Sequence, residues 1–582
     1  MTKHGRAQET PGTDRKGQGQ PRSNQDSARA RRTAATMTPR TVDAGPLIRG
    51  ICDQLGIASV INAMVDWDPV RAKLSPGNLI CALIICCFFR QHPLYKVGLV
   101  FEVTDCELLV GQGVKPEDLN DDALGRALDK LAAADPKRIF GAICSRAAVI
   151  EEVDRRFLHW DSTSRSFYGE YDRPAGDGVQ VVHGHSKDHR PDLKQILLSL
   201  LTNREGFPLW GEVHSGNESD KKLNTEVIAR IRETFGPEEL RSLIHVADSA
   251  FVTNTNLAAA AEIDLRFISR LPETYGAAGE VKARAWAGEW AEVGAVAMRR
   301  DATTYQASEQ EAEIDGRPYR LVVYRSSHLE KRKAATFEKE LTRERAELDK
   351  SADTLARQEF ACAADAETAA GTWLLQKGYH LFGAEVVSEE IPLKRQRPGR
   401  PRKDEKVATR TVWRVKAVVE GRDEEKVAIE GHRRSAFTLI TTVPKEELDA
   451  RGLLEEYKFQ GSVERRFAFA KDPEIVDAFF VKKPERVMAL GYVLLMVCLV
   501  FSVLERRVRN TGEPLPTMAR GLLKNPTGTE ILGNIFAVVT EFDDGTRQLH
   551  VPRGFQPTFA AVLRATRLNT DVYTQPPPRR SA

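Results

Sequence analysis

The spacing of hydrophobic and polar residues divides the chain into segments of different kinds. Residues 1–43 are polar and show no apolar periodicity, which predicts a disordered basic tail. From 44 to 150 hydrophobic residues recur at helical spacing, and Ser75 and Asn120 stand where helix N-caps are expected. This second segment is predicted to be an all-α N-terminal domain.

After residue 150 the pattern changes to that of strands. The runs KQILLSLLTN and PLWGEVHSG flank the turn REGF, which is typical of an antiparallel hairpin. RRFLHWDSTS precedes this hairpin, and SLIHVADSAF and LRFISRL follow it with helical patterns between them. The order β-β-β-α-β-α-β predicts an α/β fold with a mixed sheet and helices packed on it.

This core pattern is interrupted by a charged segment before the strand SAFTLITTV resumes it. The interruption holds the strand-like RPYRLVVYRSS and TRTVWRVKAVV and a long charged helix predicted over 328–361. The apolar stripe of that helix either pairs with a second protomer or folds back within the chain; it contains Leu329, Leu341, Leu348 and Leu355. The predicted division is a tail at 1–43, the all-α domain at 44–150, a first part of the core at 151–275, an α+β insertion at 276–430, a second part of the core at 431–510, and a C-terminal region at 511–582 with a disordered end.

Residues 487–504 form the longest uncharged run, VMALGYVLLMVCLVFSVL. As a helix it would be roughly 27 Å long, at the short edge of a membrane span. A helix buried on all sides in a large core has the same composition, and we favour this interpretation over a membrane anchor.

Charge and cysteine content narrow the functional class. The net charge is only +3, but residues 1–40 carry nine Lys or Arg against three acids, and KRQRPGRPRK (394–403) has six basic residues and no acid. Such basic arms on a near-neutral chain favour contact with a polyanion, most commonly nucleic acid. The eight cysteines lack metal-binding spacing and no apolar secretory signal is present, so we expect a cytoplasmic protein.

Three carboxylates are candidate catalytic residues. Asp161 and Asp248 each follow an apolar strand, and strand ends on one edge of a sheet converge. Two like charges there disfavour each other unless a cation lies between them, and carboxylate oxygens suit Mg²⁺ or Mn²⁺. Two such ions, about 3.5–4 Å apart, need a third carboxylate, for which Glu464 is the candidate. The alternative is that each aspartate only caps a turn or helix, and that Glu464 is one charge on a solvated helix face.

These motifs together resemble those of bacterial insertion-sequence DDE transposases with a Tyr-x2-Arg-x3-Glu-x6-Lys signature. The matching blocks occur in order as HWDSTS, GHSKDHRPDLKQ, HVADSAF, FISR and YKFQGSVERRFAFAK. The N-terminal segment, with GPL, HPLY and NDDALGRALD, resembles one branch of the same group. The resemblance covers most of residues 44–510 and implies an RNase H-like (retroviral integrase-like) core.

The resemblance also implies roles for individual residues. Asp161, Asp248 and Glu464 match the catalytic triad that would hold two Mg²⁺ or Mn²⁺ ions, and Tyr457 and Lys471 match the signature. The signature arginine is Gln460 here, which loses the charge and the bidentate fork that suit a phosphate. The implied activity is cleavage at the ends of an insertion sequence and joining of the 3′-hydroxyl to target DNA.

Further residues are candidate DNA contacts. His185, Lys187 and Arg190 lie in a loop that could touch phosphates, or that is only a polar connection. The segment RPGRPRK partly resembles an AT-hook, with Pro398 where arginine is usual; its basic positions, with the two that precede them, are Lys394, Arg395, Arg397, Arg400, Arg402 and Lys403. Trp286, Trp290, Trp373 and Trp413 are candidates for an aromatic wedge against a flipped base or for core residues.

Three hypotheses follow from the sequence. The first is an active metal-dependent DNA transposase that binds terminal repeats and target DNA as a homodimer near the bacterial nucleoid. The second is a catalytically silent DNA-binding relative, which Gln460 favours. The third is a membrane-anchored protein, which rests on residues 487–504 alone.

Overall fold

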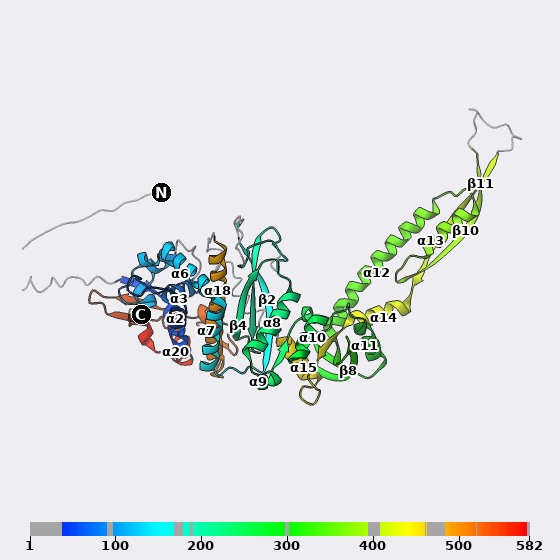
Figure 1. Ribbon diagram of the computed structural model, residues 1–582. Coiled ribbons are helices and arrows are strands. Elements are labelled where there is room, and N and C mark those ends of the chain that lie inside the picture. Colours follow the sequence, from blue (N-terminus) through cyan, green and yellow to red (C-terminus); the bar gives the residue numbers. More distant parts are fainter. Residues whose placement is uncertain are drawn as a thin grey trace, which may run out of the picture.

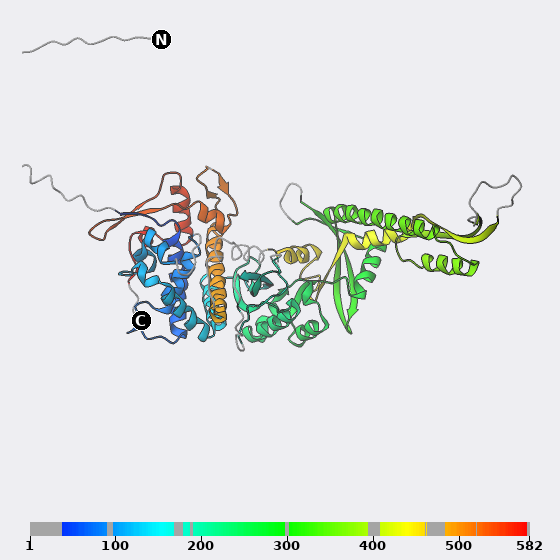
Figure 2. The ribbon, with the colours of Figure 1, turned by 90° about the horizontal axis from the view of Figure 1, so that it is seen from above.

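The computed structural model is elongated (Figure 1). A domain of helices lies at one end, a large sheet lies in the middle, and a long arm projects from the other end, as Figure 2 shows from above. The described residues are 38–89, 97–167, 171, 178–186, 190–296, 302–393, 408–459, 461, 483–519 and 521–578. The predicted disorder of residues 1–37 falls outside them.

The helical domain forms because apolar helices begin at well-defined caps. The Ser75 side-chain oxygen accepts a hydrogen bond from Asn78 N at the start of α3, and Asn120 accepts one from Ala123 N at the start of α6, both as predicted. The elements are α1 (Gly45–Leu55), α2 (Ile57–Met64), α3 (Pro76–Cys86), α4 (Val97–Val103), α5 (Cys106–Val110), η2 (Pro116–Leu119), α6 (Asp121–Ala133) and α7 (Pro136–Ile150).

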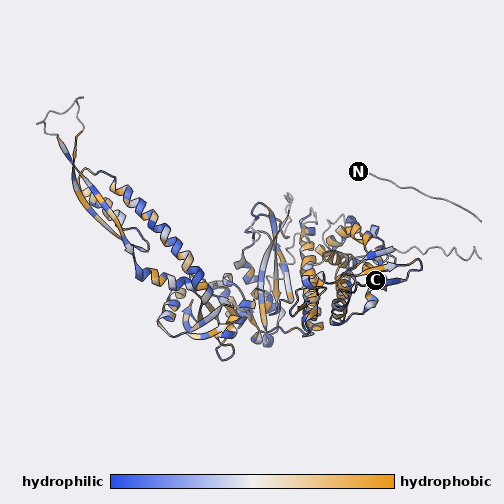
Figure 3. Ribbon diagram, turned by 180° about the vertical axis from the view of Figure 1, so that it is seen from behind, coloured by the Kyte–Doolittle hydropathy of each residue, from blue (hydrophilic) through white to orange (hydrophobic). Residues whose placement is uncertain are grey.

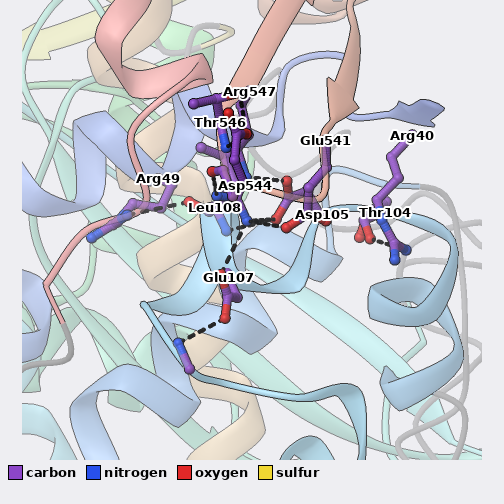
Figure 4. Close-up of polar contacts among 12 residues, drawn as sticks. Arg40, Arg49, Thr104, Asp105, Glu107, Leu108, Glu541, Asp544, Thr546 and Arg547 are labelled. Atoms are coloured by element: carbon purple, nitrogen blue, oxygen red, sulfur yellow. Dashed lines mark hydrogen bonds and ion pairs between the residues drawn. The ribbon is translucent and has the colours of Figure 1, made fainter. Parts of the chain in front are cut away.

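The C-terminal segment packs on this helical domain and shares its core. It contains a hairpin of β15 and β16, and β15 also pairs with β1 near the start of the described chain. Arg547 of β16 reaches the carboxylate of Asp105 (Nε–Oδ2 2.6 Å) and also contacts Glu107 and Glu541 (Figure 4). The elements are β1 (Thr38–Thr41), β13 (Leu515–Pro516), β14 (Leu522–Leu523), α19 (Gly528–Gly533), β15 (Val538–Glu541), β16 (Arg547–His550), α20 (Gln556–Ala565) and η4 (Thr570–Tyr573).

Two stretches that the sequence predicts to be disordered are ordered. Residues 38–41 form β1, and Val42, which follows it, is completely buried. At the other end, Gln112 N donates a hydrogen bond to Pro577 O, so residues up to 578 lie against the helical domain. Periodicity over so few residues cannot reveal a strand or tail whose partners lie about 500 positions away.

A sheet of nine strands occupies the middle of the molecule, in the order β4-β3-β2-β5-β6-β12-β9-β8-β7. β5 pairs in parallel with β2 and β6, whereas the other neighbouring pairs are antiparallel. The strands are β2 (Phe157–Phe167), β3 (Lys194–Thr202), β4 (Pro208–Ser215), β5 (Ile244–Val246), β6 (Arg266–Arg270), β7 (Ala291–Ala295), β8 (Thr304–Ile314), β9 (Arg317–Ser326) and β12 (Ala436–Thr441). The mixed α/β sheet agrees with the predicted fold class, but residues 291–326 extend the core sheet instead of belonging to a separate insertion.

Helices cover both faces of this sheet. One face carries α8 (Asp220–Thr234), α9 (Pro237–Ser242), α10 (Asn254–Glu262) and α11 (Gly276–Ala287), together with the turn η3 (Ser249–Phe251). The other face is covered over β3 and β4 by α18 (Pro484–Arg509) and farther along the sheet by α15 (Ala450–Phe459). The two faces are named below the α8 face and the α15 face.

Helix α18 contains the long apolar run and lies between the sheet and the helical domain. It is long and apolar enough to cross a membrane by length and composition, but 94% of its most apolar window is buried inside the protein. Hydrophobic residues dominate it and its neighbours in Figure 3. The prediction of a buried core helix is therefore confirmed.

The arm is a separate small structure that leaves the sheet after β9 and returns to it at β12. It consists of α12 (Ser327–Ala356), α13 (Ala363–Leu374), the antiparallel pair β10 (His380–Pro392) and β11 (Thr409–Arg422), and α14 (Glu424–Ser435). Leu348 and Leu355 of α12 pack against Trp373 and Val415. The apolar stripe of the long helix thus folds back within its own chain, the second of the two predicted alternatives.

Candidate active site

Asp161 lies on β2, and Asp248 follows the neighbouring strand β5. The parallel ladder between β2 and β5 pairs residues 87 positions apart, Phe157 with Ile244 through His159 with Val246. Asp161 and Asp248 have the same separation, so they continue this register two residues beyond the last pair. Adjacent strands lie about 4.8 Å apart, so carboxylates that keep this register would lie within reach of one ion.

Asp161 is not at the end of its strand, contrary to the prediction. It is the fifth of eleven residues in β2, which continues to Phe167 because its antiparallel pairing with β3 continues. What ends near Asp161 is the pairing with β5, since β5 stops at Val246. The predicted position of Asp248, just after a strand, is confirmed.

Strand alternation places both aspartates on the α15 face. Phe157, Ile244 and Val246 belong to the hydrophobic cluster under α15, whereas Leu158, Trp160 and Ala247 belong to the cluster under α8. Continuing this alternation by two residues directs Asp161 and Asp248 to the same side of the sheet as α15.

Each aspartate also makes a local hydrogen bond. Asp161 Oδ1 accepts one from Ser162 N (2.8 Å), and Asp248 Oδ1 accepts one from Ala250 N (3.0 Å) at the start of η3. Ser269 Oγ donates to the backbone oxygen of Asp248 (2.7 Å) and fixes the chain there. The predicted alternative of a capping role is thus confirmed for Asp248, which caps η3.

Helix α15 brings Tyr457, the first residue of the signature, to this face. Tyr457 is partly buried against the cluster of Leu453, Leu454 and Val246. The helix is anchored at its start, where Tyr324 Oη donates to Ala450 O (2.7 Å). The other predicted site residues of this segment, Gln460, Glu464 and Lys471, lie outside the described residues.

A buried carboxylate beside this site escaped sequence analysis. The Glu456 side chain is 5% exposed and pairs with Arg204 of the β3–β4 turn (Nε–Oε1 3.0 Å). Burial raises the pKa of Glu456 to about 7, even though the charge of Arg204 opposes that rise. One feature of the sequence could have predicted its burial: Glu456 lies three residues after Leu453, on the apolar stripe of the helix.

The predicted DNA contacts are described only in part. His185 is exposed and its backbone oxygen accepts a hydrogen bond from Gln195 Nε2 (3.3 Å), while Arg190 pairs with Asp192 (2.8 Å). Lys187 and the basic positions Lys394, Arg395, Arg397, Arg400, Arg402 and Lys403 lie outside the described residues. The ends of that basic segment are nevertheless fixed, because Leu393 N donates to Ala408 O (2.8 Å) at the far end of the arm.

The four tryptophans fall into two groups. Trp286 stacks on His432 (ring centroids 4.1 Å), and the Arg325 guanidinium lies over Trp290 (4.5 Å) where the arm joins the sheet. Trp373 is buried in the core of the arm, and Trp413 packs partly against that core. The core interpretation is therefore confirmed for Trp373.

Comparisons with known proteins give limited matches. Residues 37–145 match a family described as a domain of unknown function, DUF4277. No curated protein matches the chain. Among solved structures, a piggyBac transposase synaptic complex with hairpin DNA aligns with 90% of this chain and 81% of that one, at 8% sequence identity and a TM-score of 0.37.

Proposed function

We propose that this chain is a DNA transposase of the DDE class, which cleaves DNA at the ends of its insertion sequence and joins the freed 3′-hydroxyl to target DNA. Asp161, Asp248 and Glu464 are its proposed catalytic carboxylates. The observation that carries this proposal is the shared register of Asp161 and Asp248 on β2 and β5. It would act on bacterial chromosomal DNA in the cytoplasm, as a homodimer that holds two DNA ends.

The sheet supports an RNase H-like core for this enzyme. Three antiparallel strands are followed by two strands that run parallel to the first, giving the spatial order β4-β3-β2-β5-β6. In this order the first strand lies at the centre, beside the first parallel strand. The two aspartates therefore come from the central pair, which helices cover on both faces.

The donor set at this place suits a hard divalent cation. Two carboxylates aligned on adjacent strands supply oxygen ligands, which Mg²⁺ and Mn²⁺ prefer. Asp161, Asp248 and Glu464 are the residues that would hold two such ions. Bound there, the metal would supply charge neutralisation for the phosphodiester and an activated oxygen nucleophile.

The described residues of the chain would position the reacting groups. Ser269 fixes the backbone of Asp248. Asp161 lies within β2, which pairs with β5 at its start and with β3 from His159 to its end. Tyr457 would approach the phosphate from α15, on the face to which both aspartates point. Such fixed positions matter because alignment and charge stabilisation supply most of the catalysis in phosphoryl transfer.

A cleavage assay on DNA that carries the element's ends tests this proposal. We expect nicking at the ends that requires Mg²⁺ or Mn²⁺ and is lost with EDTA. Asp248→Asn should lower cleavage at least 1,000-fold, the order of loss that removal of an essential electrostatic group causes, while binding of the same DNA is kept. Glu233→Gln, an exposed position of α8 on the opposite face of the sheet, is the matched control and should cleave like the wild type.

The same assay separates this proposal from a catalytically silent DNA-binding relative. That alternative is favoured by Gln460, which lacks the charge of the signature arginine. Binding of the ends without nicking in any metal would establish the silent relative. Recovery of nicking by Gln460→Arg would then identify this position as the cause.

A further inference from the structure

A second cluster of metal-ligating side chains lies on the α8 face, away from the proposed catalytic carboxylates. It consists of His214 on the edge strand β4, Glu218 just before α8, and Glu226 within α8. One ligand atom from each residue lies within 4.8 Å of the other two. His214 pairs with Leu197 in the sheet, and Leu197 belongs to the cluster under α8, so the group faces the side opposite to Asp161.

The imidazole of His214 is oriented by a buried partner. His214 is 5% exposed, and its Nε2 lies 2.7 Å from Ser199 Oγ on the neighbouring strand. The Ser199 hydroxyl also lies 3.4 Å from the backbone oxygen of Glu212. The contact with Nε2 holds the ring so that Nδ1 faces Glu226, and such partners commonly orient a metal-binding histidine.

Nδ1 does not reach a hydrogen-bonding partner in the cluster. Its nearest carboxylate oxygen, Glu226 Oε2, is 3.8 Å away, a separation that a metal ion bound between the two atoms would bridge.

The cluster opens into a pocket of about 390 Å³ that holds other charged groups in pairs. Lys137 pairs with Glu212 (2.5 Å), and Arg230 pairs with Glu233 (2.6 Å). Lys222 is different because its ammonium lies between the two cluster carboxylates, 3.2 Å from Glu218 and 3.5 Å from Glu226. Its side chain is 62% exposed and flexible enough to leave.

We propose that His214, Glu218 and Glu226 form a binding site for a divalent transition metal ion, for which Zn²⁺ is the probe, and that the ammonium of Lys222 occupies the site in the absence of the ion. One imidazole nitrogen and two carboxylate oxygens are a three-ligand set that Zn²⁺ accepts, with a fourth position open to the pocket. Ser199 is the positioning residue that orients His214. The proposal is independent of the transposase assignment, because it uses other residues on the other face.

Zinc binding to the full chain, measured by equilibrium dialysis and calorimetry, tests the site. The background carries Asp161→Asn, Asp248→Asn and Cys362→Ser, with Mg²⁺ in excess, so that the proposed catalytic site and the exposed cysteine do not contribute. We expect one Zn²⁺ per chain, and a loss of affinity of at least roughly 10-fold in Glu226→Gln and about 10-fold in Ser199→Ala. Glu233→Gln, on the same helix and in the same pocket, should bind like the background.

Lys222→Met gives a test with the opposite sign. Removal of the competing ammonium should tighten Zn²⁺ binding, by a measurable fold-change, where a merely structural salt bridge would leave it unchanged. Circular dichroism of each variant checks that the fold is kept. No stoichiometric Zn²⁺, equal affinity in Glu226→Gln and Glu233→Gln, or unchanged affinity in Lys222→Met would overturn the proposal.

Discussion

The helical domain and the arm use charged residues in opposite ways. In the helical domain, Arg547 and Asp105 pair with both side chains only 3% exposed, and Arg507 and Glu151 do the same. In the arm, Glu359 pairs with Arg410 and Arg414 at the surface, where their side chains are 26–52% exposed. The buried pairs join segments about 350–440 positions apart in the sequence. The exposed pairs join elements that all belong to the arm.

This difference predicts how the two regions respond to change. A buried pair costs much when one partner is removed, because the other charge stays in a medium of low polarity. An exposed pair gains little in water and is screened by salt. The helical domain should therefore be sensitive to loss of single charges, and the arm to ionic strength.

Arg547→Met should give the largest effect. It leaves the Asp105 carboxylate buried without a guanidinium, which should cost about 3–5 kcal/mol of the free energy of unfolding. Urea denaturation followed by circular dichroism measures it. The matched control is Arg410→Met in the arm, where the Arg410 side chain is 52% exposed and the expected cost is below about 1 kcal/mol. Equal costs in the two variants would show that burial does not separate the regions.

Glu456→Gln should give an intermediate effect that depends on pH. The pKa of Glu456 is raised by burial to about 7 from an ordinary 4.5, so the folded protein binds a proton that the unfolded chain releases. Its contribution is fully present below pH 4.5 and is lost as the pH rises through 7, about 3 kcal/mol in all.

The measurement is urea denaturation from pH 5 to pH 8. The wild type should lose stability over this interval more steeply than Glu456→Gln, in which that position cannot titrate. Glu455→Gln, at the neighbouring position on the same helix, is the control and should keep the wild-type slope. Parallel slopes in wild type and Glu456→Gln would mean that Glu456 is ionised throughout.

The sequence predicted local elements of the sheet well because their signals are local. The hairpin β3–β4 follows from two apolar runs around REGF, and Ser75 and Asn120 identify helix starts by their own chemistry. The pairing of β2 with β5 was also predictable, since a mixed sheet places such strands side by side, but the continuation of β2 past Asp161 was not.

Features that depend on distant partners could not be predicted in this way. Nothing in the sequence around Arg547 or Asp105 predicts that these two charged residues pair in the core. Strand β1 has only four residues, too few for a pattern to predict it. Likewise, His214 and Ser199 acquire a common role only through the register of β3 and β4. The arm could be predicted in part. The spacing of Leu348 and Leu355 predicts that one side of α12 is buried, but it does not predict which elements pack on that side.

Glu359→Gln should give the smallest effect, and salt should erase it. Glu359 Oε1 and Oε2 accept hydrogen bonds from Arg414 and Arg410 of β11 (2.9 and 2.6 Å), an exposed fork worth about 0.2–1 kcal/mol at low ionic strength. Amide hydrogen exchange of β11 peptides should be faster in the variant at low salt and indistinguishable from wild type at high salt. Glu390→Gln is the control, because Glu390 Oε2 accepts a hydrogen bond from the hydroxyl of Thr409 (2.9 Å), a neutral donor that salt does not screen. Since both carboxylates belong to the arm, a salt-dependent difference for Glu359 and a salt-independent result for Glu390 would assign the ionic sensitivity to the exposed pairs themselves.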